Sequence, residues 1–189
     1  TINWGAPRTV TVTGVDDAVQ DGSQPYIIIT GAAVSADTNY SGLTVANVAV
    51  TNTDNDSAGV TVTPTAGLVT TEAGGTATFT IVLNSQPTAN VSIALSSSAP
   101  MEGVASPMTV TFTTVNWGAP RMVTVTGVDD AVQDGNQPYT IVTAPATSTD
   151  AAYNNLNAAN VAVSNADNDS AGVTVTPTAG LVTTEAGGT

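Results

Sequence analysis

The chain has 189 residues, with 15 acidic side chains against two arginines, a formal net charge of -13, and no lysine, histidine or cysteine. The missing residue types exclude disulfide bonds, thiolate or imidazole metal sites, and catalysis by a cysteine nucleophile or a Ser-His-Asp triad. The charge argues against nucleic acid or an anionic membrane as a partner, because both are bound through clusters of lysine and arginine, and it leaves metal cations as the natural counter-charge.

The sequence repeats itself with an offset of 113 residues. Residues 1–76 align without a gap with residues 114–189, and 59 of these 76 positions are identical. The polar, turn-forming stretch Asp54–Gly59 and its copy Asp167–Gly172 are the best candidates for linkers. A strict period longer than a solenoid unit indicates tandem whole domains. We therefore expect a window from a longer array: 1–57 is the C-terminal part of one repeat, 58–170 is a complete repeat, and 171–189 is the N-terminal part of the next.

Within residues 58–170, short runs of alternating apolar and polar residues are bounded by turn residues, and no segment has a helical period. In chain order the predicted strands are 60–63, 76–83, 91–95, 108–112, 122–128, 139–143 and 160–164. Phe79, Ile81 and Leu83 share one face of the second strand, and Val123 and Val125 share one face of the fifth. The sequence thus predicts an all-β chain of tandem immunoglobulin-like antiparallel β-sandwiches, with about seven strands per repeat.

Acidic residues gather at one end of this predicted sandwich. If successive strands run up and down, the first-second, third-fourth and fifth-sixth connections lie at the same end as the tail of the seventh strand. Of the eight acidic residues in the repeat, only Asp150 falls at the other end; the seven at this end are Glu72, Glu102, Asp129, Asp130, Asp134, Asp167 and Asp169.

Such a cluster repels itself unless it holds a counter-ion. Carboxylates converging from several loops match the six to eight hard oxygen ligands of Ca²⁺, whereas soft or redox metals lack their preferred ligands. The alternative is that these are solvated turn residues, since Asp and Asn favour turns. We favour calcium, because carboxylates from several separate loops are predicted to lie at the same end of the sandwich.

The pattern of Glu72, Asp129-Asp130, Asp134-Gly135 and Asp167-Asn168-Asp169, with aromatic residues at Phe112 and Tyr139, resembles the Calx-β family. The resemblance spans residues 58–170 and parts of both flanks. It implies a β-sandwich that binds Ca²⁺ near a domain junction, as in sodium-calcium exchangers, an integrin subunit and repetitive bacterial surface proteins. Near-identical copies rich in Thr, Val and Asn look most like the bacterial surface type.

The resemblance also implies a set of calcium ligands. In the complete repeat they are Glu72, Asp129, Asp130, Asp134, Asp167 and Asp169; the matching residues are Asp16, Asp17, Asp21, Asp54 and Asp56 in the first copy and Glu185 in the last. Two positions depart from the family pattern, because Gln137 and Asn168 stand where the family has acidic residues. Both departures remove charge, so we expect fewer ions or a weaker affinity than in regulatory members.

Other chemistry has little support. The pair Asp129 and Asp130 could be drawn as a glycosidase acid and base, but neighbours on a tight loop without an aromatic platform fit that reaction poorly. Trp117 and Tyr139 are expected to anchor the core, and Tyr153 is a better candidate for an outside contact. We therefore expect no enzymatic activity.

The function that we expect is structural: a calcium-stiffened segment of a long, secreted bacterial surface protein, in an adhesin stalk or filament, whose partners are the neighbouring repeats of the same chain. One alternative is an adhesive module that binds a host glycan or protein. Another is a self-assembling fibre subunit that pairs strands with other copies of itself. No membrane insertion is expected in this segment, since no apolar run approaches a membrane span.

Overall fold

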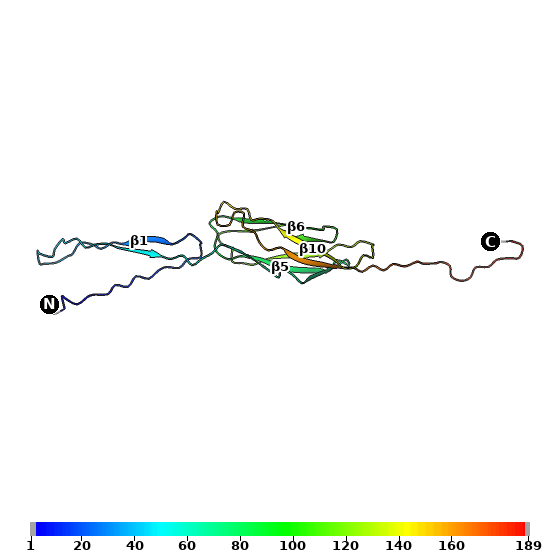
Figure 1. The fold of residues 1–189 in the computed structure, drawn as a ribbon, viewed down its shortest axis with the longest axis horizontal. Helices are drawn as coiled ribbons and strands as arrows, with labels where there is room; N and C mark the ends of the chain where they lie inside the picture. The colour runs from blue at the N-terminus through cyan, green and yellow to red at the C-terminus, as the bar shows by residue number, and fades with distance from the viewer. Residues whose placement is uncertain (1–2, 188–189) are drawn as a thin grey trace.

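A computed structural model describes residues 3–187, which contain eleven strands and no helix (Figure 1). Nothing in this described range could therefore cross a membrane as an apolar helix. A separate hairpin near the N-terminus consists of β1 (Gln24–Ile28) and β2 (Val48–Asn52). The strands of the complete repeat are β3 (Val60–Thr63), β4 (Leu68–Thr71), β5 (Thr76–Leu83), β6 (Val91–Ser97), β7 (Gly103–Ser106), β8 (Thr109–Phe112), β9 (Arg121–Gly127), β10 (Gln137–Thr143) and β11 (Val161–Ala166).

These nine strands form two sheets. One has the order β4-β11-β10-β6-β8 and the other has the order β3-β5-β9-β7. All neighbours are antiparallel except β4 and β11, which run parallel. The immunoglobulin-like antiparallel β-sandwich predicted from the sequence is confirmed.

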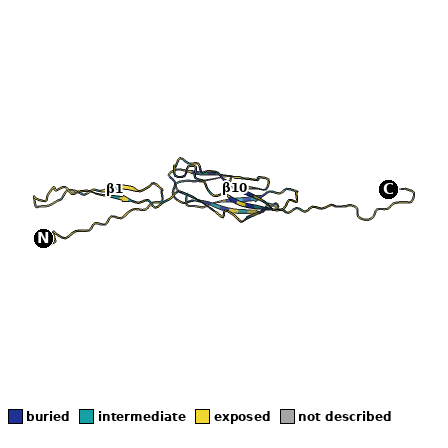
Figure 2. Ribbon diagram, in the orientation of Figure 1, coloured by how far each residue is buried: buried dark blue, intermediate teal, exposed yellow. Residues whose placement is uncertain are grey.

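The core lies between the two sheets and follows from the period-two alternation of the strands (Figure 2). Phe79, Ile81 and Leu83 of β5 are buried on one face, as predicted, and so are Val123 and Val125 of β9. The long strands therefore contribute their apolar faces to one shared core and leave most of their threonines outside, which β-sheets accommodate well.

The prediction of seven strands is low by two, because β4 and β7 were missed. Each has four residues and lies at the edge of its sheet. β4 is a strand because it pairs with β11, which lies far away in the sequence, and β7 because it pairs with β9. The alternation of four residues in the sequence says little about whether they pair with a strand elsewhere in the chain.

Sequence copies outside the complete repeat do not form all of the strands that they form inside it. Residues 8–14 copy β9, and residues 173–176 and 181–184 copy β3 and β4, yet none of these three segments is a strand. Their apolar side chains are exposed, as for Val10 at 80% and Val173 at 93%. The cause is the lack of the sheet partners that their counterparts have.

The aromatic residues of the complete repeat belong to the core. Tyr139 is buried and Trp117 packs against the core cluster, as predicted. The prediction of an outside contact for Tyr153 is wrong, because its side chain is only 1% exposed. Its hydroxyl donates to Ser85 O (2.6 Å) and accepts from Ser85 N (3.0 Å), which ties the β10–β11 connection to the end of β5.

Candidate metal centre

Two groups of three carboxylates lie at the acidic end of the sandwich. The Glu72 group consists of Glu72, Asp167 and Asp169, and the Glu102 group consists of Glu102, Asp130 and Asp134. In each group, oxygens of the three side chains lie within 4.8 Å of one another. The residues come from the β4–β5, β6–β7 and β9–β10 connections and from the segment after β11. These four places in the chain therefore converge.

Backbone hydrogen bonds hold the Glu72 group in place. Asn168 N donates to Glu72 Oε2 at 2.9 Å, while Asp169 N and Gly135 N each donate to Asp167 at 2.7 Å. Glu72 N in turn donates to Ala166 O (3.1 Å), which extends the pairing of β4 with β11. The carboxylates of Glu72 and Asp167 are thus held by backbone N–H groups of the surrounding chain.

The three carboxyls of the Glu72 group have different electrostatic environments. Hydrogen bonds from Asp169 N and Gly135 N lower the pKa of Asp167. The bond from Asn168 N lowers the pKa of Glu72, but burial and repulsion by nearby aspartates outweigh it, so the net pKa is raised. Burial, with repulsion by Asp167 and other aspartates, also raises the pKa of Asp169. The carboxyls of Glu72 and Asp169 therefore lack a compensating positive charge.

Each group also contains one buried carboxylate oxygen without a hydrogen-bond partner. These are Oε2 of Glu102 and Oδ2 of Asp169. A buried acceptor with no partner is unfavourable, and an ionised one more so. A cation bound within each group would give that group's orphaned oxygen a partner. The donor set is all oxygen, which suits a hard cation such as Ca²⁺ or Mg²⁺ and not a soft metal.

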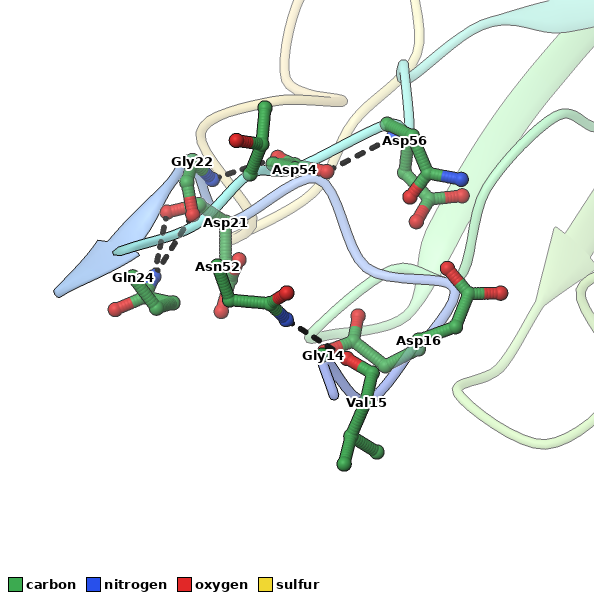
Figure 3. A pocket seen from close by; sticks show the side chains of 12 residues that line it. Gly14, Val15, Asp16, Asp21, Gly22, Gln24, Asn52, Asp54 and Asp56 are labelled. Atoms are coloured by element: carbon green, nitrogen blue, oxygen red, sulfur yellow. Dashed lines mark hydrogen bonds between the residues drawn. The ribbon is translucent and has the colours of Figure 1, made fainter. Parts of the chain in front are cut away.

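The first copy (residues 3–57) contains the same acidic loop, and its hydrogen bonds match those of the complete repeat; Figure 3 draws those among the residues that line the loop. In the complete repeat these bonds join Val132 N to Asp130, Gly135 N and Asp169 N to Asp167, and Gln137 Nε2 to Asp134 O; in the first copy they join Val19 N to Asp17, Gly22 N and Asp56 N to Asp54, and Gln24 Nε2 to Asp21 O. The first copy has no counterpart of β3 to β8 among its residues. The conformation of the loop is therefore determined locally.

Comparisons with known proteins bear on the fold alone. No protein-family model and no curated protein sequence matches the chain. Among solved structures, the periplasmic chaperone SfaE is similar over 58% of this chain and 58% of its own, at 10% identity and a TM-score of 0.45. The apo form of the Calx CBD1 domain is similar over 59% of this chain and 96% of its own, at 13% identity and a TM-score of 0.43. The CsuC–CsuE chaperone–tip adhesion subunit complex of Acinetobacter baumannii is similar over 58% and 57%, at 8% identity and a TM-score of 0.41.

The structure brings most of the sequence-predicted ligands of the complete repeat together. Asp129 belongs to neither group and accepts a hydrogen bond from Asn168 Nδ2 (3.1 Å) instead. Asn168, which removes a charge from the family pattern, thus joins Asp129 to Glu72. Glu102 was absent from the predicted ligands although the predicted topology put it at this end. The feature of the sequence that could have identified Glu102 as a ligand is its position in a connection at the acidic end.

The predicted ligands outside the complete repeat are less assembled. Among residues 3–187, the five aspartates of the first copy belong to no group of three converging carboxylates. Asp56 nevertheless has a raised pKa, because of burial and repulsion by Asp54 and other neighbours. Glu185 is exposed in the segment after the sandwich. Neither the aspartates of the first copy nor Glu185 has beside it all of the strand connections that form the site in residues 58–170.

Asp150, at the opposite end, supplies a pH-dependent contribution that does not involve the metal centre. Burial alone would raise its pKa, but bonds from Thr88 N (2.7 Å) and Ala152 N (2.9 Å) outweigh it and lower the pKa. The ionised form therefore stabilises the fold above the ordinary carboxyl pKa, and this stability is lost as the pH falls through the lowered pKa. We expect Asp150→Asn to cost roughly 1 kcal/mol at neutral pH.

In strong acid, below the lowered pKa of Asp150, the difference between the Asp150→Asn variant and the wild type should shrink. Urea unfolding in chelator at neutral and acidic pH measures it. An equal loss of stability at both pH values would contradict the assignment.

Proposed function

We propose that the complete repeat is a non-catalytic, calcium-stiffened module of a long extracellular bacterial surface protein, in an adhesin stalk or filament. The observation that carries this proposal is the pair of converging carboxylate groups at one end of the sandwich, each with an orphaned buried oxygen. Calcium would supply the positive charge that these groups lack. Glu72, Asp167 and Asp169 would hold one ion and the Glu102 group a second.

Contacts between the acidic loops and the linkers support a role at domain junctions. Ala171 N donates to Oε1 of Gln133 in the acidic loop, and Ala58 N donates to the matching Gln20 of the first copy. Across the junction, Gln86 N of the sandwich donates to Ala18 O of the first copy (2.6 Å). An ion that fixes the acidic loop would therefore also restrain the linker and the next repeat.

In this proposal the partners of the repeat are its neighbours along the chain, and the location is the secreted or cell-surface space. Millimolar extracellular calcium suits weak sites of this type. A stalk needs stiffness and no chemistry, and the missing lysine, histidine and cysteine agree with that role.

Small-angle X-ray scattering of three tandem copies of residues 58–170 tests the proposal. In calcium we expect a long, narrow particle, and in chelator a shorter mean dimension and a broader distance distribution, because the junctions loosen. The isosteric pair Asp130→Asn and Asp134→Asn, which removes two ligands of the Glu102 group, should reproduce part of the effect of chelator in the presence of calcium. The matched control Asp150→Asn, at the other end, should not. Identical scattering curves in calcium and in chelator would contradict the proposal.

A further inference from the structure

A groove opens between β8 of one sheet and the start of β9 in the other. It has a volume of about 510 Å³ and is lined by residues 109–111, residues 120–122 and Pro107. All of these residues belong to the complete repeat, so the groove is formed without the flanking copies. The linker from the first copy joins the sandwich at β3, which is at the opposite edge of the four-stranded sheet.

The groove is open because β7 pairs with only part of β9. Their pairing covers residues 124–127 of β9 and ends at Ser106 of β7. Pro107 and Met108 then carry the chain across to β8, which belongs to the other sheet. Residues 121–123 therefore have no strand of the described chain (3–187) beside them on that side, and β8 forms the far wall of the groove.

Arg121 places the one positively charged side chain of residues 58–170 in this groove. It is on the same face of β9 as the buried Val123 and Val125, so its side chain points between the sheets. Its guanidinium carbon lies 5.9 Å from the centre of the Phe112 ring, and its Nε is buried without a hydrogen-bond partner among residues 3–187. The ring stabilises the charge but gives Nε no acceptor.

The acidic residues of the repeat do not supply that acceptor. Seven of the eight lie beyond the other end of β9, a strand of seven residues that spans about 20 Å. This separation is more than twice the Debye length of about 8 Å at physiological ionic strength. Asp150 is at the same end as Arg121, but its carboxylate accepts hydrogen bonds from Thr88 N and Ala152 N. The guanidinium of Arg121 is therefore available to a carboxylate from outside the chain.

The rest of the lining suits a sugar ring. Thr109 and Thr111 are exposed and offer hydroxyl groups. Pro107, Pro120 and Met122 offer apolar surface to the C–H groups of a ring. Sites for small ligands typically combine such apolar surface with a few polar groups in a volume of about 300–1,000 Å³.

We propose that this groove binds a uronic acid residue of an acidic polysaccharide, with the guanidinium of Arg121 on its carboxylate. A planar guanidinium recognises a carboxylate through paired hydrogen bonds, and a ligand oxygen would give Nε its missing acceptor. An acidic peptide fits less well as an added strand, because the open edges are short and are flanked by Pro107 and Pro120, which have no N–H. This binding goes beyond the proposed stalk function and does not require calcium.

Titration of the full chain with trigalacturonate, followed by heteronuclear NMR in chelator, tests the site. Chelator is needed because calcium would bridge the ligand to the acidic end of the sandwich. We expect the amide signals of Thr109, Thr111 and Arg121 to shift. The neutral methyl ester of trigalacturonate should bind about tenfold more weakly or worse, because it cannot form the charge-assisted hydrogen bonds.

Two variants weaken the carboxylate contact in different ways. Arg121→Gln removes the charge, and Met122→Glu adds a negative charge to the groove at a side chain that is 64% exposed, where the fold tolerates it. Met101→Glu is the matched control, since Met101 is 71% exposed and lies outside the groove. We expect Arg121→Gln and Met122→Glu to raise the Kd about tenfold or more and Met101→Glu to leave it unchanged.

A wild-type chain that does not bind trigalacturonate, or a Kd that neither Arg121→Gln nor Met122→Glu changes, would overturn the site. Tri-aspartate that binds as tightly as trigalacturonate would overturn the choice of a saccharide and point to an acidic peptide. Because the titration is performed in chelator, its result does not depend on the calcium function. The scattering experiment on the tandem repeats tests that function separately.

Discussion

Removing calcium is expected to lower the melting temperature of the complete repeat by roughly 10 to 20 °C. A site at a free calcium concentration 100 times its Kd contributes about 2.7 kcal/mol, and each kcal/mol shifts the melting temperature of a domain of this size by about 4–8 °C. Calorimetric scans in calcium, magnesium and chelator measure the shift. Magnesium should give a smaller shift of the melting temperature, because Mg²⁺ demands near-ideal octahedral geometry and gives up its bound water reluctantly. Equal melting temperatures in calcium and in chelator would contradict the metal centre.

Glu72→Gln should change the melting temperature in opposite directions in the two conditions. The raised pKa of Glu72 means that without metal its ionisation destabilises the fold, a penalty that sets in as the pH rises through the ordinary carboxyl pKa and is complete above the raised pKa. In chelator at neutral pH the variant should therefore melt higher, since glutamine keeps an oxygen for Asn168 N. In calcium it should melt lower, because a ligand is lost. A decrease of the same size in both conditions would mean that Glu72 acts only as a packing residue.

Tyr153→Ala is expected to lower the free energy of unfolding by roughly 3 to 5 kcal/mol, the range for removing a large buried aromatic side chain. The substitution leaves a cavity in the core and also deprives the backbone of Ser85 of two hydrogen bonds. Urea unfolding in chelator, followed by circular dichroism, measures this loss independently of calcium. Tyr153→Phe should fall between the wild type and Tyr153→Ala, because it removes only the hydroxyl.

The first copy provides the matched control for Tyr153. Tyr40 is the same residue one period earlier, but it is 60% exposed. Tyr40→Ala should change the free energy of unfolding of the sandwich by less than about 0.5 kcal/mol. A similar loss for both variants would show that the two tyrosines play the same role, against the structure.

The long strands of the fold could be predicted from the sequence because alternation over five to eight residues is a local signal. Identical segments show where that signal ends. Val60–Thr63 is a strand, whereas the same four residues at 173–176 are not, because only the first has β5 beside it. For strands of this length, pairing with a distant partner decides the structure.

The candidate site was predictable to the extent that strand direction decides which loops meet. That argument brought Glu72, Asp167 and Asp169 to one end without any knowledge of their contacts. It could not assign Asp129 to the hydrogen bond with Asn168, since that depends on side-chain geometry. It also misjudged Tyr153, because nothing in the sequence of its loop indicates that the hydroxyl reaches Ser85, 68 residues away.

The lengths of the edge strands have a consequence for a protein built from near-identical domains. The four edge strands, β3, β4, β7 and β8, have four residues each, while the strands inside the sheets have six to eight. Neighbouring repeats with the same sequence are prone to misfolding by pairing with one another. Edges this short offer little template for such pairing, which favours folding of the sandwich from the strands of its own repeat.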